Sequence, residues 1–320
     1  MSSEQTNGFY VPVIAVAGVG LIGGSLALAL KQRGMVNQVI GFGRSRENLE
    51  KAKILGAIDE ISTSIAEAAH KADIIVLATP AGSMADILEE ILPELDQNKI
   101  ITDVASVKHG IVEQALDILG PLSSRFVPAH PIAGKEHSGV TAASDDLFQD
   151  HKVAITPSVK TDADACRRIE DMWSAVGADV VTMGVAEHDR VLAMTSHLPH
   201  ILAYAMVHLF ASGKDKEKCY EMAAGGFYDF TRIASSDPVM WRDICRMNRE
   251  QVLTHIENYQ ETLERIASMI EKGDDDEIEA LFASAKAARA IVTERRKGNK
   301  DQSEAERQSG KRRVQQLVNR

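Results

Sequence analysis

The feature that most constrains the fold is a glycine-rich turn near the N-terminus, set between an apolar run and a helical pattern. The run Val13–Ala17 predicts a buried strand, and the turn Gly18–Gly23 has the spacing Gly-x-Gly-x-x-Gly. A helix is expected from Ser25 to Arg33, and Val39–Phe42 predicts a second strand. This order of strand, turn, helix and strand is typical of a βαβ unit that binds a dinucleotide.

Each glycine of the turn has its own expected role. Gly18 permits a tight turn, Gly20 lets the backbone approach a pyrophosphate, and Gly23 lets the helix pack close to the strand. The free N–H groups and the positive dipole end of the helix would bind phosphate. The residues that we expect to contact the cofactor at this edge of the sheet are Gly18, Gly20, Leu21, Ile22, Gly23, Thr79 and Pro80.

The end of the second strand favours one cofactor over another. A site for NAD usually has an acidic residue there, which binds the ribose 2′-hydroxyl. This chain instead reads Arg44-Ser45-Arg46. Two guanidinium groups and a hydroxyl suit a 2′-phosphate, which an acid would repel. The sequence therefore favours NADP over NAD, although NAD remains possible and the two arginines could be solvated surface charges.

Further strands and helices alternate through the first half of the chain. A helix is expected from Glu47 to Leu55, where Gly56 stops it. Four more strands are expected at Ile74–Ala78, Ile100–Val104, Phe126–Pro128 and Lys152–Thr156. Strands joined by helical crossovers predict an α/β fold of the Rossmann type, a doubly wound and mainly parallel sheet. We assign residues 10–184 to this dinucleotide-binding domain.

The pattern becomes helical after residue 184. One helix is expected from Glu187 to Phe210, kinked by Pro199, and a second from Pro238 to about Ile270. A third should follow the acidic segment 274–276. The second helix has apolar residues at the spacing of a packed seam, namely Val252, Ile256, Tyr259, Leu263, Ile266 and Ile270. We therefore expect an all-helical substrate and dimerisation domain over residues 185–297, and a homodimer.

Composition excludes several classes of protein. The net charge of −10 over 320 residues argues against nucleic-acid binding. The segment 298–320 is basic and polar, and we expect a disordered tail there. No signal peptide and no apolar run of about 20 residues is visible, so we expect a cytoplasmic protein that does not enter a membrane. Three scattered cysteines fit a reducing compartment and give no metal-ligand spacing.

Four further segments have residue patterns that are too specific to serve the fold alone. They are Thr102–Lys108 at the end of the fourth strand, His130–Glu136 after the fifth, and Ser196–His200 and Gly225–Arg232 in the helical part. Strand ends of open α/β sheets are where ligands bind. The other histidines have no metal-ligand spacing and are expected on the surface or in the core: His70, His109, His137, His151, His188, His208 and His255.

These segments, with the glycine turn, closely resemble prephenate and arogenate dehydrogenases, enzymes of tyrosine biosynthesis. The matching stretches are GVGLIGGS, DVASVK, HPIAGKE, SHLPH and GGFYDFTRIA, in that order, and the resemblance covers residues 11–297. It implies oxidation of a cyclohexadienyl ring by a nicotinamide cofactor, with loss of CO2. Such a reaction needs a base near the ring hydroxyl and a cation for a carboxylate.

The resemblance also implies roles for residues. His130 would be the base that removes the proton of the ring 4-hydroxyl, and Ser106 would hydrogen-bond that hydroxyl. Arg232 would clamp the ring carboxylate, and an ion pair is its structural alternative. His197 would support substrate binding, whereas His200 is expected to be structural. The remaining residues expected to bind substrate are Trp241, which would close the pocket, Glu136 and Lys135.

Two choices stay open at this stage. The expected substrate is prephenate, since a cation at Lys135 could favour the pyruvyl carboxylate, but arogenate or dual specificity is the alternative. A non-catalytic dinucleotide-binding redox sensor would not need His130, Ser106 and Arg232 together. A dehydrogenase of the 3-hydroxy-acid type would carry a helix-borne lysine with a nearby asparagine, and no such arrangement lies between Gly184 and Phe210.

Overall fold

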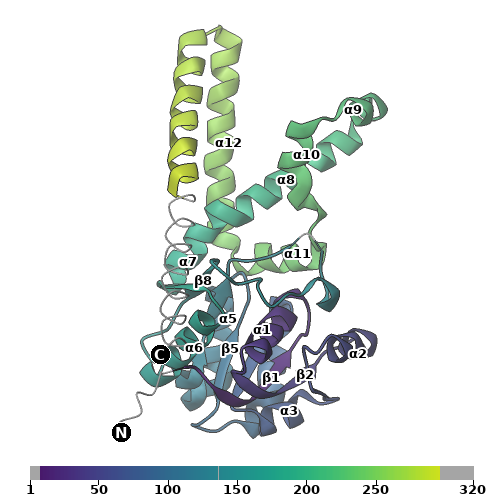
Figure 1. The fold of residues 1–320 in the computed structure, drawn as a ribbon. Helices are drawn as coiled ribbons and strands as arrows, with labels where there is room; N and C mark the ends of the chain where they lie inside the picture. Colours follow the sequence, from purple (N-terminus) through teal and green to yellow (C-terminus); the bar gives the residue numbers. More distant parts are fainter. Residues whose placement is uncertain (1–7, 136, 296–320) are drawn as a thin grey trace, which may run out of the picture. The chain divides into compact units, whose positions relative to one another are not determined.

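A computed structural model describes residues 8–135 and 137–295 (Figure 1). Its centre is a six-stranded sheet in the order β3-β2-β1-β4-β5-β6, in which every pairing is parallel. This arrangement confirms the predicted Rossmann-type sheet. The strands are β1 (Val11–Ala17), β2 (Val36–Phe42), β3 (Glu60–Ile61), β4 (Ile74–Leu77), β5 (Ile100–Asp103) and β6 (Phe126–Val127).

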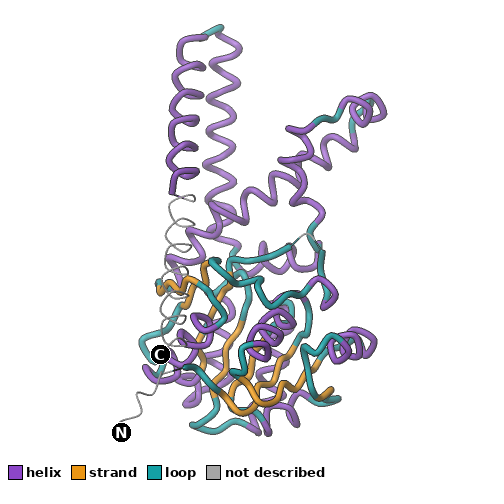
Figure 2. The backbone as a smooth tube through the Cα atoms, viewed as in Figure 1, coloured by secondary structure: helices purple, strands orange, loops and turns teal. Residues whose placement is uncertain are grey.

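Helices cover both faces of this sheet (Figure 2). They are α1 (Leu21–Gln32), α2 (Arg46–Ile54), α3 (Ile65–Lys71), α4 (Met84–Ile91), α5 (His109–Leu119) and α6 (Ala163–Ala175). Alternate residues of β1 enter two different cores: Ile14 and Val16 pack with α1 and α6, whereas Ala15 and Ala17 pack with α3, α4 and α5. A strand buried on both faces explains why its sequence is apolar throughout.

A second, three-stranded sheet corrects one prediction. We expected Lys152–Thr156 to continue the parallel sheet, but β8 (Lys152–Ile155) instead pairs antiparallel with β7 (Ala129–Pro131) and parallel with β9 (Asp179–Thr182). Pro128 separates β6 from β7, and its carbonyl accepts a hydrogen bond from Thr156. Because proline has no N–H to donate, the chain leaves the first sheet there.

The expected helix from Glu187 to Phe210 has three parts. They are α7 (Val185–Leu192), a π-helical turn (Ala193–His197) and α8 (Leu198–Ser212). The bend therefore begins before Pro199, which occupies the first turn of α8, where its missing N–H costs nothing. The π turn also carries His197, one of the predicted site residues.

The expected helix from Pro238 to Ile270 is broken as well. It consists of α11 (Pro238–Met247) and α12 (Arg249–Lys272), and Asn248 between them leaves the helical conformation with φ −110° and ψ 35°. The Asn248 side chain donates to the backbone oxygen of Asp189. This buried contact holds the break, and the apolar spacing did not reveal it.

The remaining helices are short or lie after residue 255. They are α9 (Lys216–Met222), α10 (Gly225–Thr231), helical residues 275–295, and the 3₁₀ turns Ala81–Ser83, Leu92–Glu94, Gly120–Arg125, Val140–Ala142 and Arg232–Ser235. The chain divides into two compact units, residues 1–255 and 256–320. Within the second unit, the helical stretches on either side of Gly273 form a hairpin (Figure 1).

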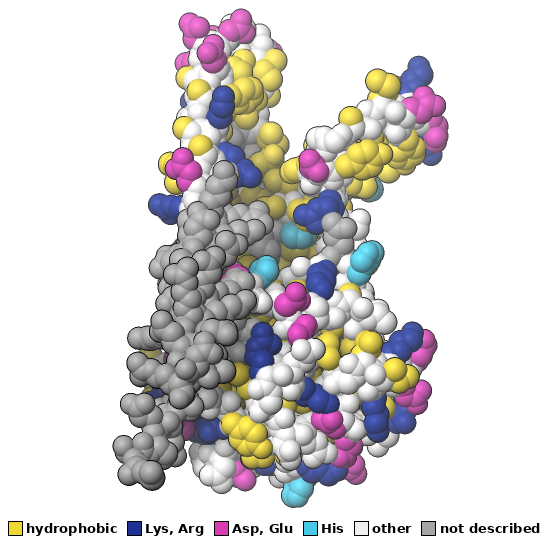
Figure 3. Space-filling model, in the orientation of Figure 1, with side chains coloured by type: hydrophobic (Ala, Val, Ile, Leu, Met, Phe, Trp, Pro, Cys, Tyr) yellow, Lys and Arg dark blue, Asp and Glu magenta, His cyan; other side chains and the backbone are white. Residues whose placement is uncertain are grey.

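The helices α8 to α10 expose much apolar surface, visible as yellow side chains along them in Figure 3. Leu209, Met222 and Tyr228 are all more than half exposed. None of the helices described is long and apolar enough to cross a membrane.

Candidate active site

The glycine turn has the geometry that a dinucleotide needs. Gly18 has φ +94°, and a Cβ atom there would lie 2.5 Å from the carbonyl oxygen of Ala78. A Cβ atom on Gly23 would lie 2.4 Å from the carbonyl oxygen of Gly18, so α1 packs directly on the turn. A Cβ atom on Gly20, in contrast, would meet nothing within 4 Å. The backbone is therefore open to a ligand at Gly20 alone of these three positions.

The N-terminus of α1 lies at this open position. No side chain caps it, and its first turn, which begins at Leu21 and Ile22, contains no acid. The Thr79 hydroxyl lies nearby after β4 and is buried without a hydrogen-bond partner among the described residues. Free N–H groups, a helix dipole and an unpaired hydroxyl fit a pyrophosphate-containing cofactor. Pro80 follows Thr79 and is exposed.

The segment after β2 uses two of its three predicted residues locally. The Ser45 hydroxyl accepts a hydrogen bond from the Asn48 backbone and so caps α2, at 3.2 Å. Arg46 pairs with Glu50 one turn along, at 2.9 Å, and both side chains are well exposed. Arg44 is exposed and makes no hydrogen bond within the described part of the chain. It is the guanidinium of this segment that a ligand could engage without breaking another contact.

Asn48 holds the glycine turn in place. Its side-chain amide donates to the carbonyl of Val19 at 2.7 Å and accepts from the backbone N–H of Val140 at 3.4 Å. The sequence reasoning omitted Asn48, because nothing in its spacing indicated a contact with either segment.

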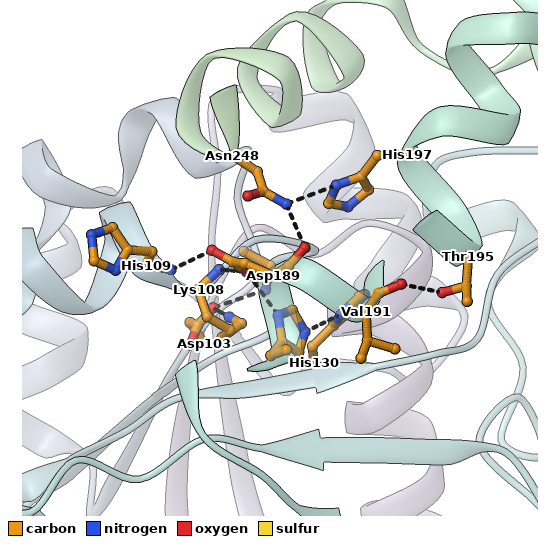
Figure 4. Close-up of polar contacts among 11 residues, drawn as sticks. Asp103, Lys108, His109, His130, Asp189, Val191, Thr195, His197 and Asn248 are labelled. Carbon is orange, nitrogen blue, oxygen red and sulfur yellow. Dashed lines mark hydrogen bonds and ion pairs between the residues drawn. The ribbon is translucent and has the colours of Figure 1, made fainter. Parts of the chain in front are cut away.

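His130 lies in β7 and is almost fully buried. Its Nδ1 atom is 2.9 Å from Nε2 of His188, and Nδ1 of His188 is 2.8 Å from a carboxylate oxygen of Asp189. The Asp189 carboxylate also accepts the backbone N–H groups of Lys108 and His109, at 2.9 and 2.8 Å (Figure 4). A continuous chain of hydrogen bonds thus runs from the N-terminus of α5 to His130.

A buried ion pair lies in the same region. The Lys108 ammonium bonds the carboxylate of Asp103, and both side chains are completely buried. Asp103 also accepts from the backbone N–H groups of Ala105 and Ala129, at 2.9 and 3.2 Å. Burial lowers the pKa of Lys108, and the negative charge of Asp103 opposes that effect. Asp103 thus joins the end of β5 to the start of β7, which carries His130.

Burial keeps the two central histidines in their neutral form. Burial lowers the pKa of His130 well below 6.5, and electrostatic interactions with His188, Lys108 and His197 lower it further. Burial likewise lowers the pKa of His197 to about 4, against the opposing effect of the Asp189 carboxylate and the Ser106 backbone. Both imidazoles are therefore neutral at neutral pH.

One ring nitrogen of His197 is bonded to Asn248, and the ring also lies beside the Ser106 backbone. Asn248 donates to its Nδ1 atom at 3.1 Å, so the ring proton must be on Nε2. That Nε2 atom is buried and makes no hydrogen bond that meets the usual geometric limits within the described residues. A buried, unpaired donor is costly unless a ligand satisfies it.

Aromatic rings lie beside His197. Trp241 is buried, with its ring edge-on to His197 at 6.1 Å between centroids and stacked on His200 at 3.9 Å. The charge of Arg232 contributes to a lowered pKa of His200, after the larger effect of burial, which places the guanidinium close to that ring. Arg232 itself is exposed.

The structure therefore brings most predicted substrate residues together, with two exceptions. Ser106, half buried after β5, lies beside His197, and His197 in turn adjoins Trp241. Lys135, however, is exposed and bonds the Ala142 carbonyl and the Ser144 hydroxyl, at 3.1 and 2.8 Å. Glu136 lies outside the described residues.

Three functional candidates escaped the sequence reasoning. They are His188, which bonds His130, Asp189, which bonds His188, and Asn248, which bonds His197. His188 was expected to be an ordinary core or surface residue, and it is indeed buried. Among the described residues, no group of three or more His, Cys, Asp or Glu side chains could hold a metal ion.

Comparisons with known proteins identify one family over most of the chain. The model of the prephenate dehydrogenase nucleotide-binding domain matches residues 26–182, and that of the prephenate dehydrogenase dimerization domain matches residues 185–284. Prephenate dehydrogenase of Bacillus subtilis is 37% identical over 290 residues, covering 89% of this chain and 77% of its own. Cyclohexadienyl dehydrogenase of Zymomonas mobilis is 34% identical, covering 87% of this chain and 95% of its own.

Solved structures extend the likeness to the fold. Prephenate dehydrogenase from Aquifex aeolicus, in complex with hydroxyphenyl propionate and NAD+, superposes with a TM-score of 0.83 at 35% identity, covering 89% of this chain and 99% of its own. Arogenate dehydrogenase from Synechocystis superposes with a TM-score of 0.74 at 29% identity, covering 88% and 99%. The similarity thus extends over most of the chain, and the second family model includes the helices that carry His197 and Trp241.

Proposed function

Because this chain belongs to the prephenate dehydrogenase family, we propose that it oxidises and decarboxylates prephenate to 4-hydroxyphenylpyruvate with a nicotinamide dinucleotide. The observation that carries the proposal is the position of His130. It is a buried, neutral imidazole, its Nδ1 atom is hydrogen-bonded to His188, and it lies within the matched nucleotide-binding domain, residues 26–182.

His130 acts as the general base. Its low pKa keeps the imidazole neutral at neutral pH, so that one ring nitrogen can take the proton of the ring 4-hydroxyl. When bound, the nicotinamide supplies the acceptor for the hydride that leaves C4. The bond between the ring and its carboxylate then breaks, and the electron pair left behind completes the aromatic ring as CO2 departs. Aromatisation makes the reaction effectively irreversible.

His197 and Ser106 hold the substrate. The unpaired Nε2–H of His197 donates to a substrate oxygen as a neutral group, since a pKa of about 4 excludes a charged imidazole at neutral pH. Ser106 is close to this histidine and orients the ring hydroxyl toward His130. Trp241 forms the apolar wall of the same region.

Arg232 binds a carboxylate of the substrate. A planar, permanently charged guanidinium suits a carboxylate, and the neighbouring His200 is neutral and stacked on Trp241, so it does not compete as a cation. We retain Glu136 and Lys135 as residues for the side-chain end of the substrate. The contacts of Lys135 with Ala142 and Ser144 leave its charge in place but fix its position.

Arogenate is the second candidate substrate. It is favoured by the relatives named cyclohexadienyl and arogenate dehydrogenase, which match this chain over nearly its whole described length. A two-by-two assay separates the possibilities, with prephenate or arogenate and with NAD or NADP. Turnover of prephenate at least tenfold more efficient than that of arogenate supports the proposal. Cofactor binding without turnover of either substrate would refute it and favour a redox sensor.

The cofactor is a nicotinamide dinucleotide, and we propose a preference for NADP. Support comes from Arg44, which is exposed beside the turn, and from the absence of an acid at the end of β2. Replacing Arg44→Asp should shift the ratio of kcat/KM values toward NAD, because the new carboxylate repels a 2′-phosphate and accepts a ribose hydroxyl. Arg46→Asp is the matched control, since Arg46 already pairs with Glu50. An equal shift in both variants, or none, contradicts the assignment.

We also propose that residues 185–297 form a helical domain through which two copies of the chain associate. The matched family model is described as a dimerization domain, and the helices of this segment expose apolar side chains such as Leu209, Tyr228 and Leu263. Light scattering at micromolar concentration should give twice the mass of one chain. A monomer at that concentration would refute the proposal.

A further inference from the structure

Behind His130, the described structure contains an ordered series of three side chains. Asp189, His188 and His130 are joined in that order by hydrogen bonds of 2.8 and 2.9 Å. His188 and Asp189 adjoin each other on α7, whereas His130 lies on β7. His188 is completely buried, so water does not compete for either bond.

The directions of these bonds follow from the chemistry of the groups. An ionised carboxylate can only accept hydrogen bonds, so Nδ1 of His188 must donate to Asp189. With Nδ1 of His188 donating to Asp189, an Nε2 atom that carries the lone pair of the ring accepts the bond from His130. Nδ1 of His130 must therefore carry the proton. It follows that Nε2, the other nitrogen of His130, has a free lone pair.

From this series we infer that His188, anchored by Asp189, is a positioning residue that fixes His130 as the Nδ1–H tautomer and so directs its basic Nε2 atom at the substrate. The inference rests on the proposed role of His130 as the base. It adds a residue that contacts neither substrate nor cofactor and acts through His130 alone.

Asp189 is well suited to be the fixed end of the series. Its carboxylate accepts two backbone N–H groups at the start of α5 as well as Nδ1 of His188. Burial raises its pKa, but the hydrogen bonds from His188, His109 and Lys108 outweigh burial and lower it. The carboxylate thus stays ionised and cannot donate in the reverse direction.

The same hydrogen bonds remain when His130 becomes charged. When the O–H bond of the substrate breaks and Nε2 of His130 gains the proton, the imidazolium still donates its Nδ1–H to His188. A hydrogen bond from a charged donor is stronger than one from a neutral donor. The charged or titratable groups that face His130 are His188, Lys108 and His197, and a positive charge on any of them disfavours the imidazolium.

Two substitutions at one position test the inference. The side-chain amide of His188→Asn can replace Nδ1 of the histidine and keep a bond to Asp189, but it is too short to reach His130. The longer His188→Gln can place its carbonyl oxygen where Nε2 was and accept from His130. We expect kcat to fall about 100-fold in the asparagine variant and about tenfold or less in the glutamine variant. The KM for substrate and the affinity for NADP should stay within about threefold in both.

Nitrogen NMR of protein labelled with ¹⁵N-histidine reports the tautomer directly and needs no turnover. In the wild type, the His130 signals should show a protonated Nδ1 and a bare Nε2, and the His188→Asn variant should show a mixture. His130→Asn identifies the signals. A protonated Nε2 in the wild type overturns the inference, as does a glutamine variant no more active than the asparagine variant. If the wild type turned over no cyclohexadienyl substrate, the proposed function would fail, whereas the NMR result would still decide the tautomer.

Discussion

Acid should destabilise this protein through His197, and the structure gives the size of the effect. The imidazole titrates near 6.5 in the unfolded chain but at about 4 in the fold, because burial disfavours its charged form. Between these values the unfolded chain binds more protons than the folded protein. The stabilisation is therefore complete above about pH 6.5 and is lost progressively as the pH falls toward 4.

The magnitude follows from the two pKa values. Lowering the pH from about 7.5 to about 5 should reduce the free energy of unfolding by ~2 kcal/mol through His197 alone. The limit at still lower pH is ~3 kcal/mol, given 1.36 kcal/mol for each unit of pKa shift. His130 acts in the same direction, so the wild type by itself does not isolate the contribution of His197.

The His197→Asn variant isolates it. Its side-chain oxygen can still accept from Asn248, and it has no titrating group in this range. Urea unfolding of both proteins at pH 7.5 and pH 5, at one fixed protein concentration, gives four free energies. The wild type should lose about 2 kcal/mol more than the variant between the two pH values. If both proteins lose the same amount, His197 is not held neutral by burial and our account of its pKa is wrong.

Three further changes probe the base, the carboxylate clamp and the cofactor turn. His130→Asn should lower kcat by about 10²–10⁴-fold with cofactor affinity unchanged, whereas near-normal turnover would remove His130 from the mechanism. In the wild type, kcat/KM should stay level as the pH falls below 6.5, because burial keeps the base unprotonated there. Arg232→Ala should chiefly raise KM for substrate, measured by initial rates, and a fall in kcat with unchanged KM would contradict a binding role. Gly18→Ala should abolish cofactor binding in a fluorescence titration, since φ is +94° and the new Cβ would lie 2.5 Å from the Ala78 carbonyl oxygen. Gly34→Ala is the control for backbone strain, because Gly34 also has a positive φ but a Cβ atom there would meet nothing within 4 Å.

Local sequence patterns predicted the fold where the structure depends on neighbours in the chain. The strand Val13–Ala17, the turn after it and helix α1 follow from apolar runs and glycines within some 20 residues, and all three were found. The prediction failed where distant contacts decide. β8 joins the second sheet because β7 pairs with it after Pro128 interrupts the first sheet, and strand pairing across such a distance leaves no periodic signal.

The candidate site was predictable in part for the same reason. The resemblance supplied His130, His197 and Arg232 as residues of conspicuous short motifs. His188 lies 58 residues after His130 in the chain and belongs to an ordinary amphipathic helix. Asn248 carried no signal either, because it lies outside the apolar seam, which begins at Val252. Buried polar partners of this kind are set by the tertiary fold alone.

The anchoring of Asp189 has a consequence for anyone who recombines members of this family. The family models meet between residues 182 and 185, which invites a graft of one enzyme's helices onto another enzyme's sheet. Such a crossover point precedes Asp189. The carboxylate of Asp189 accepts two backbone N–H groups at the start of α5 and is linked to His130 through His188. A chimera joined there would therefore combine two halves of one hydrogen-bonded assembly from different parents. Hybrids should keep the α5 start, β7 and α7 from a single parent, even though these segments are far apart in the gene.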